Sequence, residues 1–127
     1  MSRVQLALNV SDIDEAVAFY TDLFGTEPAK RKAGYANFAI ADPPLKLVLI
    51  EGEGAGTLNH LGVEVDDGAD VEAAEARLSA DGLATTGVDD TTCCYAHKTE
   101  TWVNDPGGAP WEFYVKTGDA DRMSPTS

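Results

Sequence analysis

Hydrophobic and polar residues alternate at the start of the chain, and the spacing of the apolar residues then becomes helical. The apolar residues at even positions from Val4 to Val10 have the period of two that is typical of a strand with one packed face. Helical spacing follows, introduced by a helix-start box at Ser11 and closed by Gly25, which suits a left-handed cap. The pattern predicts a strand over 4–10 and a helix over 12–24.

The same order of elements is predicted twice. In the first half, YANFAI (35–40) and LKLVLIE (45–51) read as strands, and the basic residues 30–32 before them predict a solvated strand edge or a loop. The second half predicts a strand at 59–65, a helix at 67–81 that ends at Gly82, and strands at 83–88, 99–104 and 110–116. Two βαβββ modules of the α+β class are therefore expected.

The chain length suits one domain made of these two modules. With 127 residues, of which 43% are hydrophobic, the chain can bury a core of its own. We expect a single domain over 1–116, with module 1 at 1–52 and module 2 at 57–116, followed by a flexible tail over 117–127.

The charge excludes several classes of partner. Nine Lys and Arg residues against 22 Asp and Glu residues give a net charge of −13. Nucleic acids and anionic membranes repel such a surface, so neither is expected as a partner. The sequence has neither a secretory signal pattern nor a run of membrane-spanning length. The two cysteines, Cys93 and Cys94, are adjacent and cannot join distant segments, which favours a reducing cytoplasm.

Superimposing the modules brings potential metal ligands into register. Gln5 and His60 take the same place on the first strand of each module, on the face opposite the apolar row. Glu112 lies seven residues after the Asp-Pro turn of module 2, and the matching position of module 1 is Leu49. Oxygen, nitrogen and oxygen donors suit Fe(II), Mn(II) or Zn(II), and the leucine leaves coordination positions open.

Each of these residues also has a simpler explanation. A lone histidine or glutamate on a strand is more often hydrogen-bonded or solvated than a metal ligand, and glutamine is an uncommon ligand. The repeat strengthens the metal hypothesis because it places all three at corresponding positions. Glu112 adds to it, because a carboxylate within an apolar strand needs a cationic partner when it is buried.

The segment DDTTCCYAHKTE holds the cysteine pair and extends module 2 relative to module 1. Its polar composition predicts a loop, in which His97 and Lys98 carry solvated charges. The cysteines could bind a ligand, form a vicinal disulfide, or pack as small buried side chains. Tyr95, Trp102 and Tyr114 are candidate pocket aromatics, with core or rim packing as the default.

Several of these motifs together resemble the vicinal oxygen chelate superfamily, which includes glyoxalase I, fosfomycin and bleomycin resistance proteins and extradiol dioxygenases. The similarity rests on the helix SDIDEAVAFYTDLFG, the strand NHLGVEV and the segment DPGGAPWEFY. Within the superfamily, Gln5, His60, the TCCYAHK segment and Glu112 resemble the ArsI/CadI type, which comprises Fe(II)-dependent carbon–arsenic lyases and cadmium-inducible proteins. The resemblance implies a mixed sheet curled around one metal site.

The resemblance also implies an activity and roles for the residues. The chain would be a non-haem Fe(II) dioxygenase that uses O2 to cleave the carbon–arsenic bond of trivalent organoarsenicals such as methylarsenite. Gln5, His60 and Glu112 would bind Fe(II), and Cys93 with Cys94 would bind the arsenic, with no catalytic residue beyond the metal site. Two neighbouring thiolates suit trivalent arsenic, which is soft and has two exchangeable positions when it carries one organic group.

Three other functions stay open. One is cadmium or arsenite sequestration by the cysteines without turnover. Another is a glyoxalase-type thiol transferase, although Leu49 lies where such enzymes usually carry a fourth ligand. The third, metal-free drug binding, would leave His60 and Glu112 without a role. The expected partner is a small organoarsenical, and the pairing of two chains into a homodimer is undecided.

Overall fold

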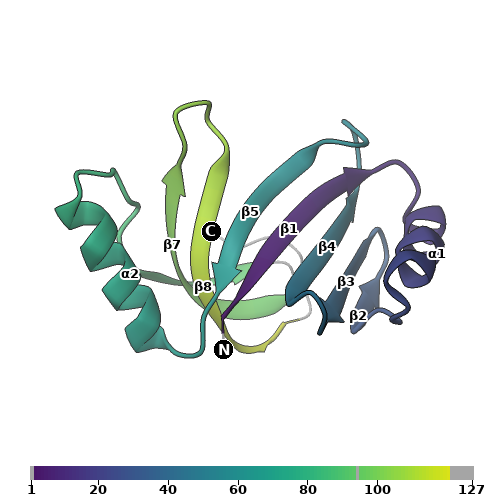
Figure 1. The fold of residues 1–127 in the computed structure, drawn as a ribbon, viewed down its shortest axis with the longest axis horizontal. Coiled ribbons are helices and arrows are strands. Elements are labelled where there is room, and N and C mark those ends of the chain that lie inside the picture. The colour runs from purple at the N-terminus through teal and green to yellow at the C-terminus, as the bar shows by residue number, and fades with distance from the viewer. Residues whose placement is uncertain (1, 94, 121–127) are drawn as a thin grey trace. The chain divides into compact units, whose positions relative to one another are not determined.

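The computed structural model describes residues 2–93 and 95–120, which fall into two compact units. The first unit spans Arg3–Leu61, and the second begins at Gly62, so that the division falls inside the strand β5 (Leu58–Glu64). Each module has the order βαβββ (Figure 1). This confirms the α+β class and the twofold repeat of elements.

In the first unit, one helix packs against one face of a β-sheet. Its hydrogen-bonded strand order is β2-β3-β4-β1-β5, in which β1 and β4 are parallel and β3 pairs with β2 and β4 in antiparallel fashion. Its elements before β5 are β1 (Arg3–Val10), α1 (Ile13–Phe24), β2 (Lys30–Lys32), β3 (Tyr35–Ile40) and β4 (Leu45–Glu51). The basic residues 30–32, expected at an edge or in a loop, form the short outer strand β2.

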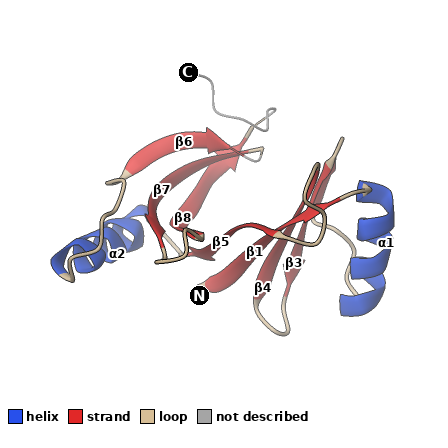
Figure 2. Ribbon diagram, turned by 90° about the horizontal axis from the view of Figure 1, so that it is seen from above, coloured by secondary structure: helices blue, strands red, loops and turns tan. Residues whose placement is uncertain are grey.

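Helix α1 follows its predicted limits and covers one face of β3 and β4 (Figure 2). The N-cap is Asp12, one residue after the expected Ser11, because its carboxylate accepts a hydrogen bond from the backbone N–H of Glu15 at 3.0 Å. Gly25 ends the helix in the left-handed conformation with φ +63°, as predicted. The helix buries its apolar side in a cluster with residues of β3 and β4.

The second unit contains the other helix, three complete strands and the end of β5. Its strand order is β5-β8-β7-β6, and α2 lies beside β7 and β8 (Figure 2). The elements are α2 (Gly68–Ala80), β6 (Asp89–Cys93), β7 (Ala96–Asn104) and β8 (Pro110–Asp119). Helix α2 begins at the cap Asp67, and Gly82 follows its end with φ +88°.

The connection between α2 and β7 differs from the sequence-based prediction. The strand expected at 83–88 is absent, and residues 89–93 form β6, which pairs with β7 as a hairpin in which Cys93 lies opposite Ala96. The polar segment expected to be a loop is therefore mostly strand. Beyond Lys116, β8 continues to Asp119, which pairs with Ala96, and residues 121–127 lie outside the described part of the chain.

No helix in the described ranges is long and apolar enough to cross a membrane.

Candidate functional site

Two of the predicted ligands, Gln5 and His60, lie side by side in the first unit. Gln5 is on β1 and 3% exposed, and His60 is on β5 and 8% exposed. The amide nitrogen of Gln5 lies 3.2 Å from His60 Nε2 and donates a hydrogen bond to it. Two polar side chains that are 55 residues apart in sequence are thus buried in contact with each other.

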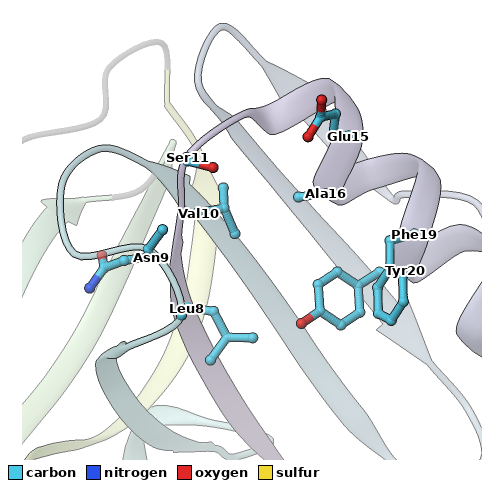
Figure 3. Close-up of a pocket in the computed structure, with 10 residues that line it drawn as sticks. Leu8, Asn9, Val10, Ser11, Glu15, Ala16, Phe19 and Tyr20 are labelled. Carbon is cyan, nitrogen blue, oxygen red and sulfur yellow. The ribbon is translucent and has the colours of Figure 1, made fainter.

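The alternation of β1 decides the face on which Gln5 lies. Leu8 and Val10 point toward α1, whereas the side chain of Asn9 lies on the other side of the strand (Figure 3). Gln5 lies four residues before Asn9 on the same strand, and alternate residues of a strand face the same side, so both side chains face away from the helix. The prediction that Gln5 lies opposite the apolar row is confirmed.

The fourth corner of the predicted site needs a correction. Leu49, which was matched with Glu112, lies in the hydrophobic cluster against α1 and pairs with Leu8 of β1. It is therefore on the opposite face from Gln5. The buried β4 residue on the Gln5 face is Val48. The prediction missed it because counting from the Asp-Pro turns cannot detect a one-residue difference in strand register. Valine, like leucine, offers no ligand.

Glu112, the third predicted ligand, belongs to the second unit and is completely buried on β8. The ammonium of Lys98, on the neighbouring strand β7, lies 3.1 Å and 3.3 Å from the two carboxylate oxygens of Glu112. Lys98 is itself only 4% exposed. A buried carboxylate needs a cationic partner, and this ion pair supplies one from within the chain.

The surroundings of Lys98 form a polar network within the second unit. A carboxylate oxygen of Glu100 lies 4.0 Å from the ammonium, which also lies 4.9 Å from the centre of the Tyr114 ring. The hydroxyl of Tyr114 in turn donates a hydrogen bond to Glu64 at 3.2 Å. Lys98 was expected to be a solvated charge, and that prediction is wrong. Its burial depends on a strand pairing that the local sequence does not indicate.

The network perturbs the ionisation of Glu100. Burial raises the pKa of the Glu100 carboxyl, and the nearby charge of Glu112 raises it further. Lys98 and a hydrogen bond from the indole N–H of Trp102 act in the opposite direction without cancelling the rise. One ammonium thus lies close to two buried carboxylates.

The candidate aromatic residues occupy different places. Tyr114 is fully buried within the polar network, and Trp102 is half-buried beside Glu100. Tyr95 lies in the β6–β7 turn with φ +62°, the only non-glycine residue of the described chain with a positive φ. The core or rim packing expected by default therefore describes Tyr114 and Trp102.

Cys93, the first of the two cysteines, lies at the end of β6 beside the β6–β7 turn. The backbone of Cys93 closes β6, whereas Cys94 lies outside the described residues. His97, on the other strand of the hairpin, is exposed, as expected, and its Nδ1 lies 2.7 Å from the hydroxyl of Thr92. The roles of the two cysteines remain predictions.

The donor chemistry of the predicted ligands fits a divalent cation. Gln5 and His60 bring an amide and an imidazole together, and Glu112 supplies a carboxylate on β8. Within residues 2–93 and 95–120, no three side chains of His, Cys, Asp or Glu gather closely enough to hold a metal ion.

A separate cavity of about 370 Å³ lies in the first unit between the end of β1, α1 and the loop at 55–56 (Figure 3). Its lining is mostly apolar and includes Leu8, Phe19 and Tyr20. Phe19 is 58% exposed, so the cavity opens to solvent along the helix. Gln5 and His60 do not line it, so the cavity and the pair of predicted ligands are different features.

Comparison with known proteins identifies the family. Residues 3–113 match the model of the glyoxalase/bleomycin resistance protein/dioxygenase superfamily. A trivalent organoarsenical cleaving enzyme from Thermomonospora curvata is 60% identical over 98% of this chain and 83% of its own length. The cadmium-induced protein CadI from Mycobacterium tuberculosis is 59% identical over 97% of this chain and 82% of its own length.

A solved dioxygenase structure is similar in fold to this chain. A variant of homoprotocatechuate 2,3-dioxygenase from Brevibacterium fuscum aligns with a TM-score of 0.66 and 25% identity, covering 94% of this chain and 33% of that one. The fold is thus similar to that of this dioxygenase. Because the family match covers most of its length and relatives are about 60% identical, the chain belongs to the glyoxalase/bleomycin resistance protein/dioxygenase superfamily.

Proposed function

We propose that this protein cleaves the carbon–arsenic bond of trivalent organoarsenicals, such as methylarsenite, and so takes part in arsenic detoxification. The observation that carries the proposal is the identity of 60% with the organoarsenical cleaving enzyme over nearly the whole chain. The reaction would release arsenite and an oxidised organic fragment, with O2 as co-substrate and Fe(II) as cofactor.

Gln5, His60 and Glu112 are the proposed Fe(II) ligands. The proximity of Gln5 and His60, both buried, supports the assignment of these two residues. When bound, Fe(II) would supply the electrons that activate O2. The apolar Val48 at the fourth corner, on the Gln5 face, is consistent with a centre that keeps positions open for reactants.

The remaining roles belong to the chain's own side chains. Cys93 and Cys94 would bind the arsenic as thiolates and leave its organic group directed away from the sulfur atoms. Holding the arsenical and O2 in one place would supply the proximity that the reaction needs. Lys98 would balance the charge of Glu112 whenever no metal is present.

The test loads reduced protein with Fe(II) under anaerobic conditions, adds methylarsenite and O2, and measures the arsenite released by chromatography with arsenic detection. Release that depends on both iron and O2 is the expected result. Cys93→Ser and Cys94→Ser are matched variants, because these are the two cysteines of the chain. They should lose arsenical binding and keep iron. Release no faster than in the metal-free protein would refute the proposal.

A second function has an observation of its own in its favour. The 59% identity with a cadmium-induced protein supports sequestration of a soft metal ion by the cysteines. In that case the protein would bind Cd(II) or arsenite tightly through Cys93 and Cys94 but would release no arsenite from methylarsenite. Calorimetric titration with Cd(II), set beside the turnover assay, separates the two functions. A glyoxalase-type thiol transferase is disfavoured by the apolar fourth corner.

A further inference from the structure

We propose that Asn59, Asn9 and Thr57 form a hydrogen-bond relay that holds the proton of neutral His60 on Nδ1 and leaves the lone pair on Nε2. Asn59 is then a positioning residue for the nitrogen that faces Gln5. The location of the proton concerns the metal-free protein, whereas its consequence for metal binding rests on the function proposed above.

The relay runs from the imidazole ring to the loop before β5. His60 Nδ1 lies 2.9 Å from Asn59 Oδ1, and Asn59 Nδ2 donates to Asn9 Oδ1 at 3.0 Å. Asn9 Nδ2 donates to the hydroxyl of Thr57 at 3.0 Å, and this hydroxyl donates to the backbone carbonyl of Gly54 at 2.5 Å. All five residues lie in the first unit.

The far end of the relay determines its direction. The carbonyl of Gly54 can only accept, so the one hydroxyl hydrogen of Thr57 must point toward it. Asn9 then has to donate to Thr57 through Nδ2, which leaves its Oδ1 to accept from Asn59. Asn59 in turn presents Oδ1 to His60, so Nδ1 of His60 must be the donor. The reversed chain would require two hydrogens from the hydroxyl of Thr57.

Gln5 provides an independent indication of the same tautomer. Its amide nitrogen, which carries only donors, lies 3.2 Å from His60 Nε2. A hydrogen bond from this amide requires a lone pair on Nε2. These two contacts, on opposite sides of the imidazole, indicate the same protonation pattern.

The backbone holds the relay in place. The backbone N–H of Asn9 donates to the carbonyl of Thr57, and the N–H of Gly56 donates to the carbonyl of Asn9, both at 2.9 Å. Gly54 has φ +78°, and a Cβ atom there would lie 3.2 Å from the hydroxyl oxygen of Thr57. A glycine at this position lets the hydroxyl approach the carbonyl closely.

Fixing the tautomer prepares His60 to bind a metal through Nε2. A ligating histidine usually donates its other ring N–H to an acceptor, and loss of such a partner typically lowers metal affinity by about 10- to 100-fold. Without an acceptor at Nδ1, the neutral ring would divide its proton between both nitrogens. The fraction of molecules with the proton on Nδ1 would then fall.

The experiment reads the tautomer by nuclear magnetic resonance in full-length, metal-free protein with ¹⁵N-labelled histidine, at pH 8.5. A His97→Gln background leaves one ring to observe, since the chain has two histidines. The expected spectrum has Nδ1 protonated and Nε2 bare. Asn59→Ala should shift the proton toward Nε2, whereas Asn59→Asp keeps an acceptor and should preserve the pattern. A protonated Nε2 in the otherwise native ring overturns the proposal.

A titration with Mn(II), followed by calorimetry, tests the consequence for metal binding. Asn59→Ala should weaken binding about 10- to 100-fold, and Asn59→Asp should restore it. Thr57→Val interrupts the relay at a distance and should have a smaller effect in the same direction. Asn104→Ala, on an exposed asparagine at the end of β7, is the matched control and should leave affinity unchanged.

These outcomes separate this inference from the proposed function. If the unaltered protein binds neither Mn(II) nor Fe(II), the metal-dependent function fails, while the spectrum still decides the tautomer. If metal binds normally and Asn59→Ala leaves its affinity unchanged, the positioning role of Asn59 is refuted and the function stands.

Discussion

At the scale of single residues, the most consequential finding is that Lys98 is buried. Its local sequence is polar, and its partner Glu112 lies 14 residues away on the next strand, so composition alone predicted a solvated charge. The burial of Glu112 was foreseeable, because it interrupts an apolar strand. The identity of its partner was not, because only the pairing of β7 with β8 brings the two side chains together.

Replacement of Lys98 by methionine should destabilise the metal-free protein by about 3–5 kcal/mol, because two buried carboxylates would lose their shared cation. The matched control is Lys116→Met, since Lys116 pairs with Asp119 at the surface and should contribute less than about 1 kcal/mol. Urea unfolding of both variants checks the difference. Equal losses of stability would contradict the structural importance of the buried pair.

Glu100 should make stability depend on pH. Its raised pKa means that the folded protein takes up this proton more readily than the unfolded chain, so the ionised carboxylate lowers stability. The cost is fully present above the raised pKa and disappears as pH falls to the ordinary range of a carboxyl group.

Glu100→Gln should therefore be more stable than the native protein at pH 7–8, with an advantage that shrinks as the solution is acidified. Thermal unfolding of both proteins, measured from pH 8 down to the ordinary titration range of a carboxyl group, checks the sign of this change in relative stability. An advantage that grows on acidification would rule out a raised pKa.

At the scale of elements, the sequence predicted both helices within about one residue, because amphipathic spacing and capping residues are local signals. It misplaced the strand before β7. The segment at 83–88 has apolar ends, but β7 pairs with residues 89–93 instead. Thr86 contacts β7 through its backbone N–H, which donates to the carbonyl of Trp102, and through its hydroxyl, which accepts from the N–H of Trp102. Strand partners are chosen by non-local register, which periodicity cannot supply.

The end of α1 allows a matched pair of glycine substitutions. Gly25→Ala should destabilise the protein by about 1–2 kcal/mol, because φ +63° is unfavourable for a residue with a Cβ atom, although nothing lies within 4 Å of that atom. Gly52→Ala also meets nothing within 4 Å and has no positive φ, so it should be neutral or slightly stabilising. Chemical denaturation measures the stability of both variants. Equal changes in the free energy of unfolding would show that the left-handed conformation of the cap is unimportant.

At the scale of the whole molecule, charge rather than any single contact governs the response to salt. A net charge of −13 opposes folding through self-repulsion, which ions screen. Raising the salt concentration from 10 to 150 mM shortens the screening length from about 30 Å to about 8 Å.

The melting temperature at pH 7 should therefore rise over this range of salt. The rise should fade near the isoelectric point of about 4.2, where the net charge vanishes. Differential scanning calorimetry at both pH values provides the measurement. A melting temperature that falls with salt at pH 7 would mean that specific ion pairs outweigh the overall repulsion.

The short basic strand β2 has a consequence for how the protein behaves when crowded. Among the described strands it has one neighbour, β3, and its other side lies at the end of the strand order. Exposed strand edges are templates on which further chains can add and form aggregates. Three consecutive cations on a strand of three residues make such addition costly, because each incoming copy would bring the same charges. The basic residues 30–32 should therefore disfavour polymerisation of concentrated protein at this edge.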